Sequence, residues 1–246
     1  MPKFFVEQKQ IENDRITIVG NDAAHISYAL RMAKGEHICV CDGHGKEYDC
    51  VLSEFFFDCV VASVVSARDC LNESPIRVYL YQALPKGDKL ETVIQKSVEC
   101  GVFEITPFES ERCIVKVKAE AEEKKTSRRN RIAEEAAKQS GRGYVPLVLQ
   151  TVSFEQAIAQ ASQADLALIC YEDEIGTTLK QALQDGQERH IGSVSVLIGS
   201  EGGFSPNEVE RAKKAGCLPI SLGKRILRTE TAPVFVLSNI CYQFEL

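Results

Sequence analysis

The feature that most constrains the fold of this chain is a regular alternation of apolar strands and amphipathic helices from Pro75 onwards. The β-branched runs "IRVYLYQA" at 76–83 and "SVSVLIG" at 193–199 are predicted strands. Segments with a helical apolar period, such as "GDKLETVIQKSVECG" at 87–101, lie between the strands. This alternation is typical of an α/β layer with a mainly parallel sheet, in which ligands bind at the C-terminal ends of strands.

The first seventy residues have a different pattern, which is rich in short β-branched and aromatic runs. Turn signals such as "CDGHGKE" separate these runs, and only "DAAHISYALRMAKGE" at 22–36 is helix-like. We therefore predict a small N-terminal β-barrel with one helix. The polar segment Arg68–Pro75 is the predicted linker. The expected domains are residues 1–72 and residues 73–246.

The composition indicates a globular chain without a membrane segment. No run of about 18 apolar residues occurs, and the N-terminal "MPKFFVEQKQ" lacks the features of a signal peptide. We therefore expect a cytoplasmic protein. The ten cysteines include no Cys-x-x-Cys pair; Cys39 and Cys41 are the closest, and on a strand they would share a face. We interpret the cysteines as small buried residues and predict no metal site.

Positive charge gathers in two segments although the formal net charge is −6. Residues 112–142 hold ten Lys or Arg against five Asp or Glu, and residues 211–228 hold six Lys or Arg and no carboxylate. A basic footprint for nucleic acid depends on such clustering and not on the total. The alternative interpretation is a pair of solvated helix faces.

The stretch "LIGSEGGFSPNEVE" at 197–210 is a glycine turn after a predicted strand. A P-loop would need Lys after its last glycine, but Phe204 follows Gly203. The order Gly-x-x-Gly-Gly does not match a dinucleotide fingerprint, and Glu201 would repel a polyanion. "IGSEG" resembles a nucleophile elbow around Ser200, but all four histidines precede this serine, which excludes the α/β-hydrolase order.

The remaining interpretation of the glycine turn is a neutral or cationic ligand held by backbone groups. Glycines let main-chain N–H and C=O groups approach a ligand closely. A nucleoside such as adenosine can be bound in this way without a phosphate clamp. Three segments would have to converge on it: Gly199–Gly203, Leu222–Gly223 and "RILRTETA" at 225–232.

These segments carry a family resemblance. "LIGSEGGFSPNEVE" followed by "SLGKRILRTETAPVFVLS" closely resembles the signature of the RsmE family, the bacterial 16S rRNA (uracil-N3) methyltransferases of the SPOUT superfamily. "ALPKGDKLETVIQKSVECGVFEITPF", "RNRIAEEAAKQSGRGYVPLV" and "HISYALRMAKGE" extend the resemblance over nearly the whole chain. It implies a PUA-like N-terminal β-barrel for RNA and a C-terminal α/β domain with a deep trefoil knot. It also implies S-adenosylmethionine as the cofactor and a homodimer.

The resemblance implies a set of cofactor-binding residues in three loops. They are Tyr171, Glu172, Gly199, Glu201, Gly202, Leu222, Gly223, Ile226 and Leu227. The glycines would supply backbone contacts, and the three aliphatic side chains would surround the adenine. The alternatives are a purely structural turn for the glycines and plain core packing for the aliphatic residues.

The chemistry of the reaction suggests two catalytic residues. Uracil N3 carries a proton and becomes nucleophilic only when that proton leaves, so a general base or a cation that stabilises the uracil anion should help. Glu201 is the candidate base, with cofactor binding and helix capping as alternatives. Arg228 is the candidate for the uracil carbonyls, and a salt bridge to Glu230 is the alternative. Thr229 and Thr231 are expected to cap the last helix, and contact with the base is the alternative.

The basic residues are candidate phosphate contacts, which position RNA without reading its sequence. They are Arg31, Lys86, Arg128, Arg129, Arg131, Arg142, Lys224 and Arg225. The expected function is methylation of N3 of a uridine in 16S rRNA (position 1498 in standard rRNA numbering), on the small ribosomal subunit. The alternatives are an RNA-binding assembly factor with a degenerate cofactor site and a SPOUT methyltransferase acting on tRNA.

Overall fold

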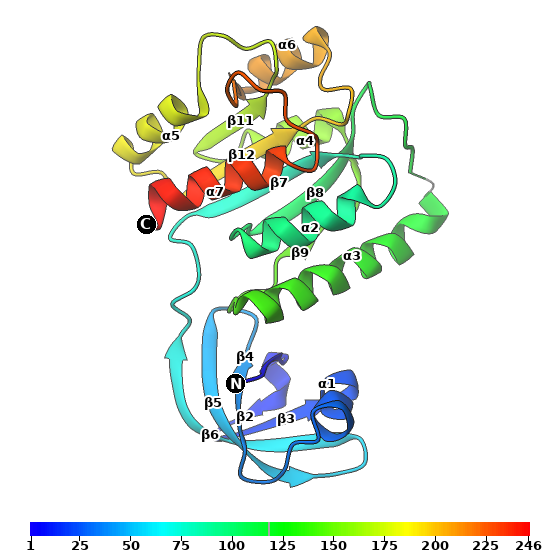
Figure 1. The fold of residues 1–246 in the computed structure, drawn as a ribbon, viewed down its shortest axis with the longest axis vertical. Helices are drawn as coiled ribbons and strands as arrows, with labels where there is room; N and C mark the ends of the chain where they lie inside the picture. Colours follow the sequence, from blue (N-terminus) through cyan, green and yellow to red (C-terminus); the bar gives the residue numbers. More distant parts are fainter. Residues whose placement is uncertain (118) are drawn as a thin grey trace. The chain divides into compact units, whose positions relative to one another are not determined.

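A computed structural model describes residues 1–117 and 119–246, which form two compact units. The units are Met1–Glu73 with Ala137–Val145, and Ser74–Ala136 with Pro146–Leu246. The fold is mixed α/β, with a curled half-barrel sheet in the first unit and a parallel sheet in the second (Figure 1). The first unit thus includes a segment, 137–145, that is distant in the sequence.

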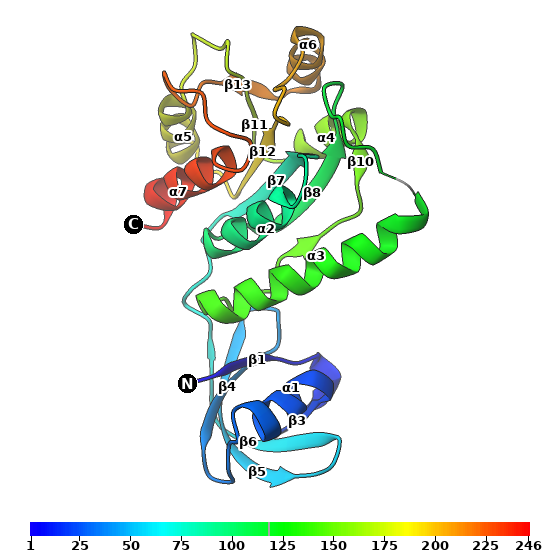
Figure 2. The ribbon, with the colours of Figure 1, turned by 45° about the vertical axis from the view of Figure 1, so that its right-hand side comes forward.

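The sheet of the first unit has six strands, and only its β1–β4 pair is parallel. Their spatial order is β1 (Lys3–Phe5), β4 (His37–Cys41), β5 (Lys46–Phe55), β6 (Cys59–Asp69), β3 (Arg15–Val19) and β2 (Ile11–Glu12). Figure 2 shows the β5–β6 hairpin. The short helical elements are η1 (Gln8–Gln10), α1 (Gly20–Ala24) and η2 (His25–Ala29). The predicted helix over 22–36 is therefore wrong beyond Ala29.

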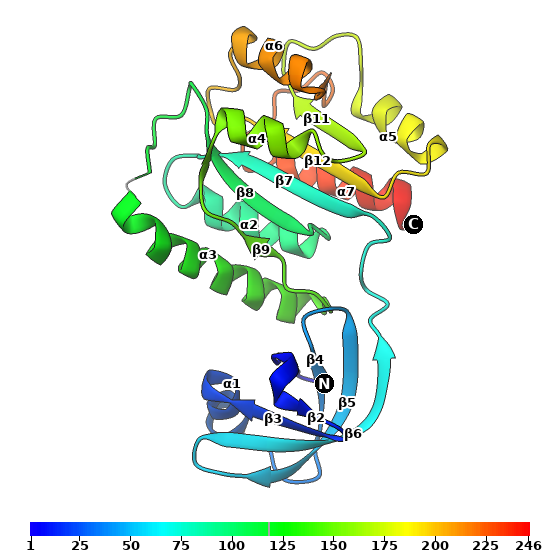
Figure 3. The same cartoon turned by 180° about the vertical axis from the view of Figure 1, so that it is seen from behind.

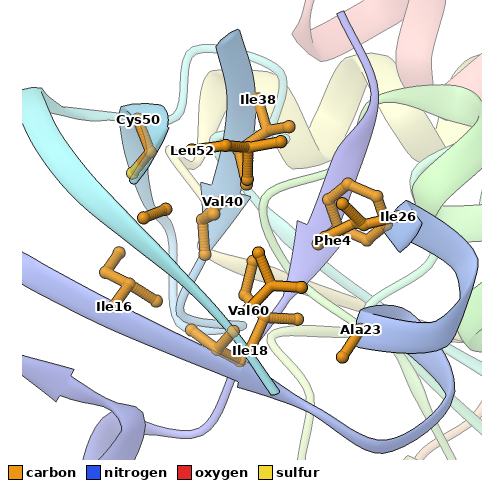
Figure 4. Packing of buried hydrophobic residues seen from close by; sticks show 12 residues of the cluster. Phe4, Ile16, Ile18, Ala23, Ile26, Ile38, Val40, Cys50, Leu52 and Val60 are labelled. Carbon is orange, nitrogen blue, oxygen red and sulfur yellow. The ribbon is translucent and has the colours of Figure 1, made fainter. Parts of the chain in front are cut away.

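The core of the first unit lies on one face of the curled sheet. Successive side chains of a strand point to opposite faces, and Ile38 and Val40 of β4 both point into the core, where neither is exposed. Figure 4 shows them packed with Phe4, Ile26 and Leu52, among others. The odd-numbered residues of β4 consequently belong to the other face of the sheet.

The sheet of the second unit confirms the prediction of a mainly parallel layer, because all its strand pairs are parallel. Its order is β10 (Val152–Ser153), β8 (Glu104–Glu109), β7 (Arg77–Ala83), β12 (Ser193–Ile198), β11 (Leu166–Cys170) and β13 (Leu218–Ile220), and β9 (Leu147–Val148) pairs with β8. The sequence pattern did not indicate β9 and β10, since two residues are too few to show a strand period.

Helices cover both faces of this parallel sheet. The helices from β7 onwards are α2 (Lys89–Glu99), α3 (Ala119–Ser140), α4 (Phe154–Ala161), α5 (Leu179–Glu188), α6 (Pro206–Ala215) and α7 (Ala232–Phe244), and the last residues of α3 belong to the first unit. Figures 1 and 3 show α2 and α7 on one face and α4 on the other, while α5 packs against α7 and α6 contacts α4 and β13. None of the helices in the described part of the chain is long and apolar enough to span a bilayer.

Local sequence signals fix the helix α6 that follows the glycine turn. Ser205 is the N-cap and accepts a hydrogen bond from the Glu208 N–H, and the Glu208 side chain accepts one from the Ser205 N–H. Pro206 occupies the first turn, and Gly216 ends the helix with φ of 101°. Loss of such an N-cap typically costs about 1 kcal/mol. The turn before α6 is therefore anchored at its C-terminal end.

Candidate functional site

Three loops meet at one edge of the parallel sheet. Strand β11 lies between β12 and β13, with Ile169 beside Leu197 and Cys170 beside Ile220. Because the strands are parallel, their C-terminal ends share one edge. The loops that begin at Tyr171, Gly199 and Ser221 therefore emerge side by side. The structure thus brings together the segments that the sequence analysis expected to converge.

The glycine turn after β12 has no room for larger residues. The Gly203 N–H donates to the Ser200 carbonyl at 3.0 Å, and Gly203 has φ of 64°, which favours glycine. A Cβ on Gly199 would lie 3.0 Å from the backbone of Gly203, and one on Gly203 would lie 2.5 Å from a Glu172 carboxylate oxygen. Close backbone packing therefore favours glycine at 199, and the left-handed φ favours it at 203.

A buried hydrogen-bond network, which the sequence analysis missed, holds the start of the glycine turn. The Thr229 hydroxyl donates to the Gly199 carbonyl at 2.7 Å. Gln82 on β7 donates to the Thr229 hydroxyl at 3.0 Å and to the Ala83 carbonyl at 2.9 Å. Gln82 and Thr229 are both buried. The signal for Gln82 was an amide side chain near the C-terminal end of the strand "RVYLYQA", where all other residues after Arg77 are apolar or aromatic.

The expectation that Thr229 and Thr231 cap the last helix is wrong. Thr229 lies before α7 and uses its hydroxyl in the Gln82 network. Thr231 occupies the N-cap position of α7, but its side chain makes no capping hydrogen bond. A tertiary contact explains the difference for Thr229, because its hydroxyl donates to a carbonyl in a turn thirty residues earlier in the chain.

Glu201 is held by a lysine cluster at the surface of the turn. Its Oε1 accepts hydrogen bonds from the Lys86 N–H at 3.1 Å and from Lys89 Nζ at 2.9 Å. Lys89 Nζ also lies 3.5 Å from Glu230 Oε2. Although partial burial raises the pKa of Glu201, the contacts with Lys89 and Lys86 outweigh it and hold the pKa below its ordinary value. Glu201 is therefore ionised at neutral pH.

Arg228 is an exposed cation beside this cluster. Among the described residues it makes no ion pair, and Glu230 faces Lys89 instead. The predicted alternative of an Arg228–Glu230 salt bridge is therefore wrong. The Arg228 carbonyl accepts hydrogen bonds from the Thr231 and Ala232 N–H groups, so the backbone of Arg228 is fixed while its guanidinium faces solvent.

The aliphatic residues of the third loop are not core residues. Ile226 is 89% exposed, and Leu222 and Leu227 are partly buried. Gly223 has φ of 105° with no atom near the position of a Cβ. Tyr171 and Glu172 stand at the start of the neighbouring loop, and the Tyr171 N–H donates to the Ile220 carbonyl at 3.0 Å. Plain core packing therefore does not explain Ile226.

Two of the predicted RNA contacts are buried in ion pairs, and we correct their assignment. Arg129 is 8% exposed and lies 3.1 Å from Glu122. Arg142 is 4% exposed and makes a bidentate pair with Glu73, with contacts down to 2.7 Å. A phosphate cannot reach a guanidinium that is covered in this way, so both arginines have a structural role. The spacing of Lys and Arg in the sequence does not show which of them are paired.

The other predicted RNA contacts are exposed: Arg31, Lys86, Arg128, Arg131, Lys224 and Arg225. Arg128 is paired with Glu91 at 2.9 Å, and Arg131 with Glu135 at 3.3 Å. Such exposed pairs contribute little to stability and can open. Lys118, which belongs to the first basic segment, lies outside the described residues. Lys86, Lys224 and Arg225 belong to the loops of the sheet edge.

A cleft of about 420 Å³ lies elsewhere, at the C-terminal end of β8. Its lining includes four carboxylates, from Glu109, Glu111, Glu155 and Glu208, and none of the three loops. These carboxylates are engaged internally; Glu208 accepts the Glu111 N–H at 2.7 Å, and Glu109 accepts the Val117 N–H at 2.7 Å. We therefore do not assign the cofactor to this cleft.

Comparison with known proteins identifies a matching family model and similar proteins. Residues 72–241 match the family model described as an RNA methyltransferase domain. A protein of Bacillus subtilis named ribosomal RNA small subunit methyltransferase E is 38% identical, over 100% of this chain and 98% of the relative. A Synechocystis protein of the same name is 32% identical, over 97% of this chain and 76% of the relative.

Solved structures agree over the whole chain. A ribosomal RNA small subunit methyltransferase E from Neisseria gonorrhoeae, bound to S-adenosyl methionine, has a TM-score of 0.87 and 31% identity, with 99% of this chain and 98% of that chain covered. A putative methyltransferase from Legionella pneumophila in complex with the cofactor SAM has a TM-score of 0.85 and 32% identity, with 98% and 96% covered.

Proposed function

The chain belongs to the ribosomal RNA small subunit methyltransferase E family, and on this premise we propose that it transfers a methyl group from S-adenosylmethionine to 16S rRNA. We propose N3 of a uridine as the acceptor and the small ribosomal subunit as the substrate. The observation that carries the proposal is the meeting of three loops at the ends of β11, β12 and β13, with the glycine turn at its centre.

The loops fit the proposed cofactor. Gly199 and Gly203 carry no side chain that could cover the turn, so main-chain groups can face a ligand. When bound, S-adenosylmethionine supplies an electrophilic methyl group. In the proposal, the turn and the exposed third loop hold the nucleoside part, with Ile226 against the adenine. The residues that we assign to the cofactor are Tyr171, Glu172, Gly199, Glu201, Gly202, Leu222, Gly223, Ile226 and Leu227.

Arg228 is our candidate for stabilising the uracil anion. When N3 loses its proton, negative charge gathers on the two carbonyl oxygens of the ring, and a fixed cation nearby lowers the energy of that state. Arg228 has an anchored backbone and an exposed guanidinium that is free of carboxylates among the described residues. This arrangement leaves all its donors available for the substrate.

Glu201 has two proposed roles, proton acceptor or cofactor ligand. Its contacts to the Lys86 N–H and to Lys89 Nζ both fall on Oε1, and in the proposal Oε2 is the oxygen that acts on the substrate or cofactor. The lowered pKa weakens Glu201 as a base, because a carboxylate that holds its charge firmly accepts a proton less readily. This observation favours the role of cofactor ligand.

The finer features of the fold and assembly belong to the same proposal. We propose that the curled sheet of the first unit is a PUA-like barrel that binds RNA through Arg31, among other residues. We propose a deep trefoil knot in the second unit, a homodimer, and action in the cytoplasm. Exposed Lys86, Arg128, Lys224 and Arg225 are the proposed phosphate contacts.

The deciding experiment is transfer of labelled methyl from S-adenosylmethionine to small subunits purified from a strain that lacks this gene. Mass mapping of the rRNA should place one methyl on the base of a single uridine near the 3′ end. Methyl on cytosine, guanine or a ribose hydroxyl would contradict the uracil-N3 assignment.

Two outcomes would revive the alternative functions. Methylation of bulk tRNA in place of small subunits would indicate a tRNA methyltransferase. Binding to small subunits without heat of S-adenosylmethionine binding in calorimetry would indicate an assembly factor with a degenerate cofactor site.

A further inference from the structure

Two buried thiols lie on the face of the first unit's sheet that is turned away from its apolar core. On β4, Ile38 and Val40 point into the core, and Cys39 and Cys41 point to the opposite face. Cys39 is nevertheless only 4% exposed and Cys41 is not exposed at all. These cysteines are therefore not explained as small apolar core residues, an explanation that does fit Cys50.

The strand register surrounds the two thiols with charged groups. Lys3 of β1 is paired in register with Cys39, and Glu47 of β5 is paired with Cys41. Arg68 of β6 is paired with Glu47. The Cys39 thiol donates to Glu47 Oε1 at 2.9 Å, and Lys3 Nζ lies 3.0 Å from the same oxygen. One carboxylate and two thiols thus form a compact polar cluster.

We propose that Cys39, Cys41 and Glu47 form a binding site for a thiophilic divalent cation, for which Zn²⁺ is the best match. Their two sulfur atoms and one carboxylate oxygen lie within 4.8 Å of one another. Tetrahedral coordination with zinc–sulfur bonds of about 2.3 Å separates two sulfur ligands by about 3.8 Å. The cluster thus offers three ligands, and a fourth position is left for water or an added ligand.

The charges around the cluster determine how a cation would enter. The hydrogen that the Cys39 thiol donates to Glu47 Oε1 is the proton that a bound cation would displace, and Lys3 lies against the same carboxylate oxygen. Arg68 Nε lies 3.3 Å from Glu47 Oε2, but the arginine side chain is 70% exposed and can swing away. Lys3 is the competitor for Glu47, because its side chain is only 11% exposed and also donates to the Gly141 carbonyl at 2.8 Å.

The spacing rule for zinc sites missed this cluster for a structural reason. Such rules rely on ligands that are close in sequence, typically Cys-x-x-Cys pairs. Here two ligands alternate along one strand, and the third comes from the neighbouring strand of the hairpin through its register. The sequence pattern places Cys39 and Cys41 on one face of a strand, but it carries no signal that places Glu47 beside them.

The test is an anaerobic titration of the reduced, metal-free chain with Cd²⁺. Binding is measured through the ultraviolet thiolate-to-metal charge-transfer band. We expect one tight equivalent per chain and a higher melting temperature with the metal. Cys39→Ser and Cys41→Ser should each weaken binding by at least about tenfold, by analogy with lost metal-site interactions. Cys59→Ser, at a partly exposed cysteine outside the cluster, is the matched control and should bind like the unmodified chain.

Two further variants keep the test decisive if a cysteine variant folds poorly. Lys3→Met removes the competing ammonium and should raise the Cd²⁺ affinity by about tenfold or more. Glu47→Gln should lower the affinity while the charge-transfer band persists. The proposal is overturned if the unmodified chain shows no stoichiometric band, if both cysteine variants keep it, or if Lys3→Met weakens binding. The proposal would also be overturned if Cys39 and Cys41 form a disulfide on oxidation while the reduced protein binds no metal.

Discussion

The two halves of the proposed cofactor site differ in how they are held. The glycine turn, Gly199–Gly203, is fixed by a buried hydrogen bond from Thr229 and by close backbone packing. The third loop, from Leu222 to Arg228, has mostly exposed side chains and an open glycine, and only Leu222 and Leu227 are partly buried. The difference teaches that the fold alone fixes the glycine turn, whereas few contacts within the chain hold the side chains of the third loop. Substitutions in the two halves should therefore fail in different ways.

The largest effect is expected in the open half, for Arg228→Gln. Loss of a group that stabilises charge in the transition state typically lowers turnover by about 100-fold to 1,000-fold. Since the side chain is exposed, the free energy of unfolding should stay within about 0.5 kcal/mol of the parent value. Turnover on small subunits and urea denaturation measure the two quantities. Arg225→Gln, at an exposed neighbour, is the control and should reduce turnover far less; equal losses would remove Arg228 from its catalytic role.

In the glycine turn, Gly199→Ala should reduce both stability and cofactor affinity. Its Cβ would lie 3.0 Å from the Gly203 backbone, which has little freedom to move. Overpacking of this kind costs about 1–3 kcal/mol. Calorimetry with S-adenosylmethionine and thermal unfolding measure the change. Gly192→Ala is the control, because its Cβ would meet only an Asp165 oxygen at 3.7 Å. An unchanged affinity in Gly199→Ala would contradict a backbone cradle.

Thr229→Val and Thr231→Val compare a buried hydroxyl with an exposed one. The first removes a hydrogen bond to the Gly199 carbonyl and leaves Gln82 with one partner fewer, at a cost of about 1–3 kcal/mol. The second changes a side chain without a capping bond, so its effect should remain within about 0.5 kcal/mol. Urea denaturation measures the free energy of unfolding of both variants. Equal losses of stability would mean that the Gln82–Thr229 network does not hold the glycine turn.

The smallest effect is electrostatic and concerns Lys89→Met. Because the lysine lowers the pKa of Glu201, its removal should raise that pKa, which NMR titration of labelled glutamate can follow. A depressed carboxyl pKa contributes stability above the unfolded-state pKa, and this contribution is lost as the pH falls through the folded-state pKa. The variant should thus lose less stability on acidification. Lys96→Met, whose partner is Glu99, is the control and should leave the pKa of Glu201 unchanged.

The proposed roles of Glu201 can be separated in the same framework. Glu201→Gln should lower the methylation rate at similar cofactor affinity if the residue is the base. A collapse of the affinity for S-adenosylmethionine would instead identify Glu201 as a cofactor ligand, the role that its lowered pKa favours.

Much of the second unit could be predicted because its signals are local. The parallel layer follows from alternating apolar periods, and α6 follows from the Ser205–Glu208 capping pair with Gly216 at its end. The glycine turn is contiguous in the sequence, so its ligand class could be narrowed by eliminating other motifs. Features that depend on pairing of distant residues were the ones missed or misassigned. Examples are the burial of Arg129, the hydroxyl contact of Thr229 and the presence of Gln82 behind the turn.

The sequence alone determined the strand–helix alternation, the turn and the residue types that can act there, since each depends on neighbours within a few positions. Only the tertiary structure decided which cations are free and which are paired, because ion pairs such as Arg142–Glu73 join residues far apart in the chain. It also decided that Glu47 stands beside Cys39 and Cys41, because strand register, and not sequence spacing, brings side chains of different strands onto one face.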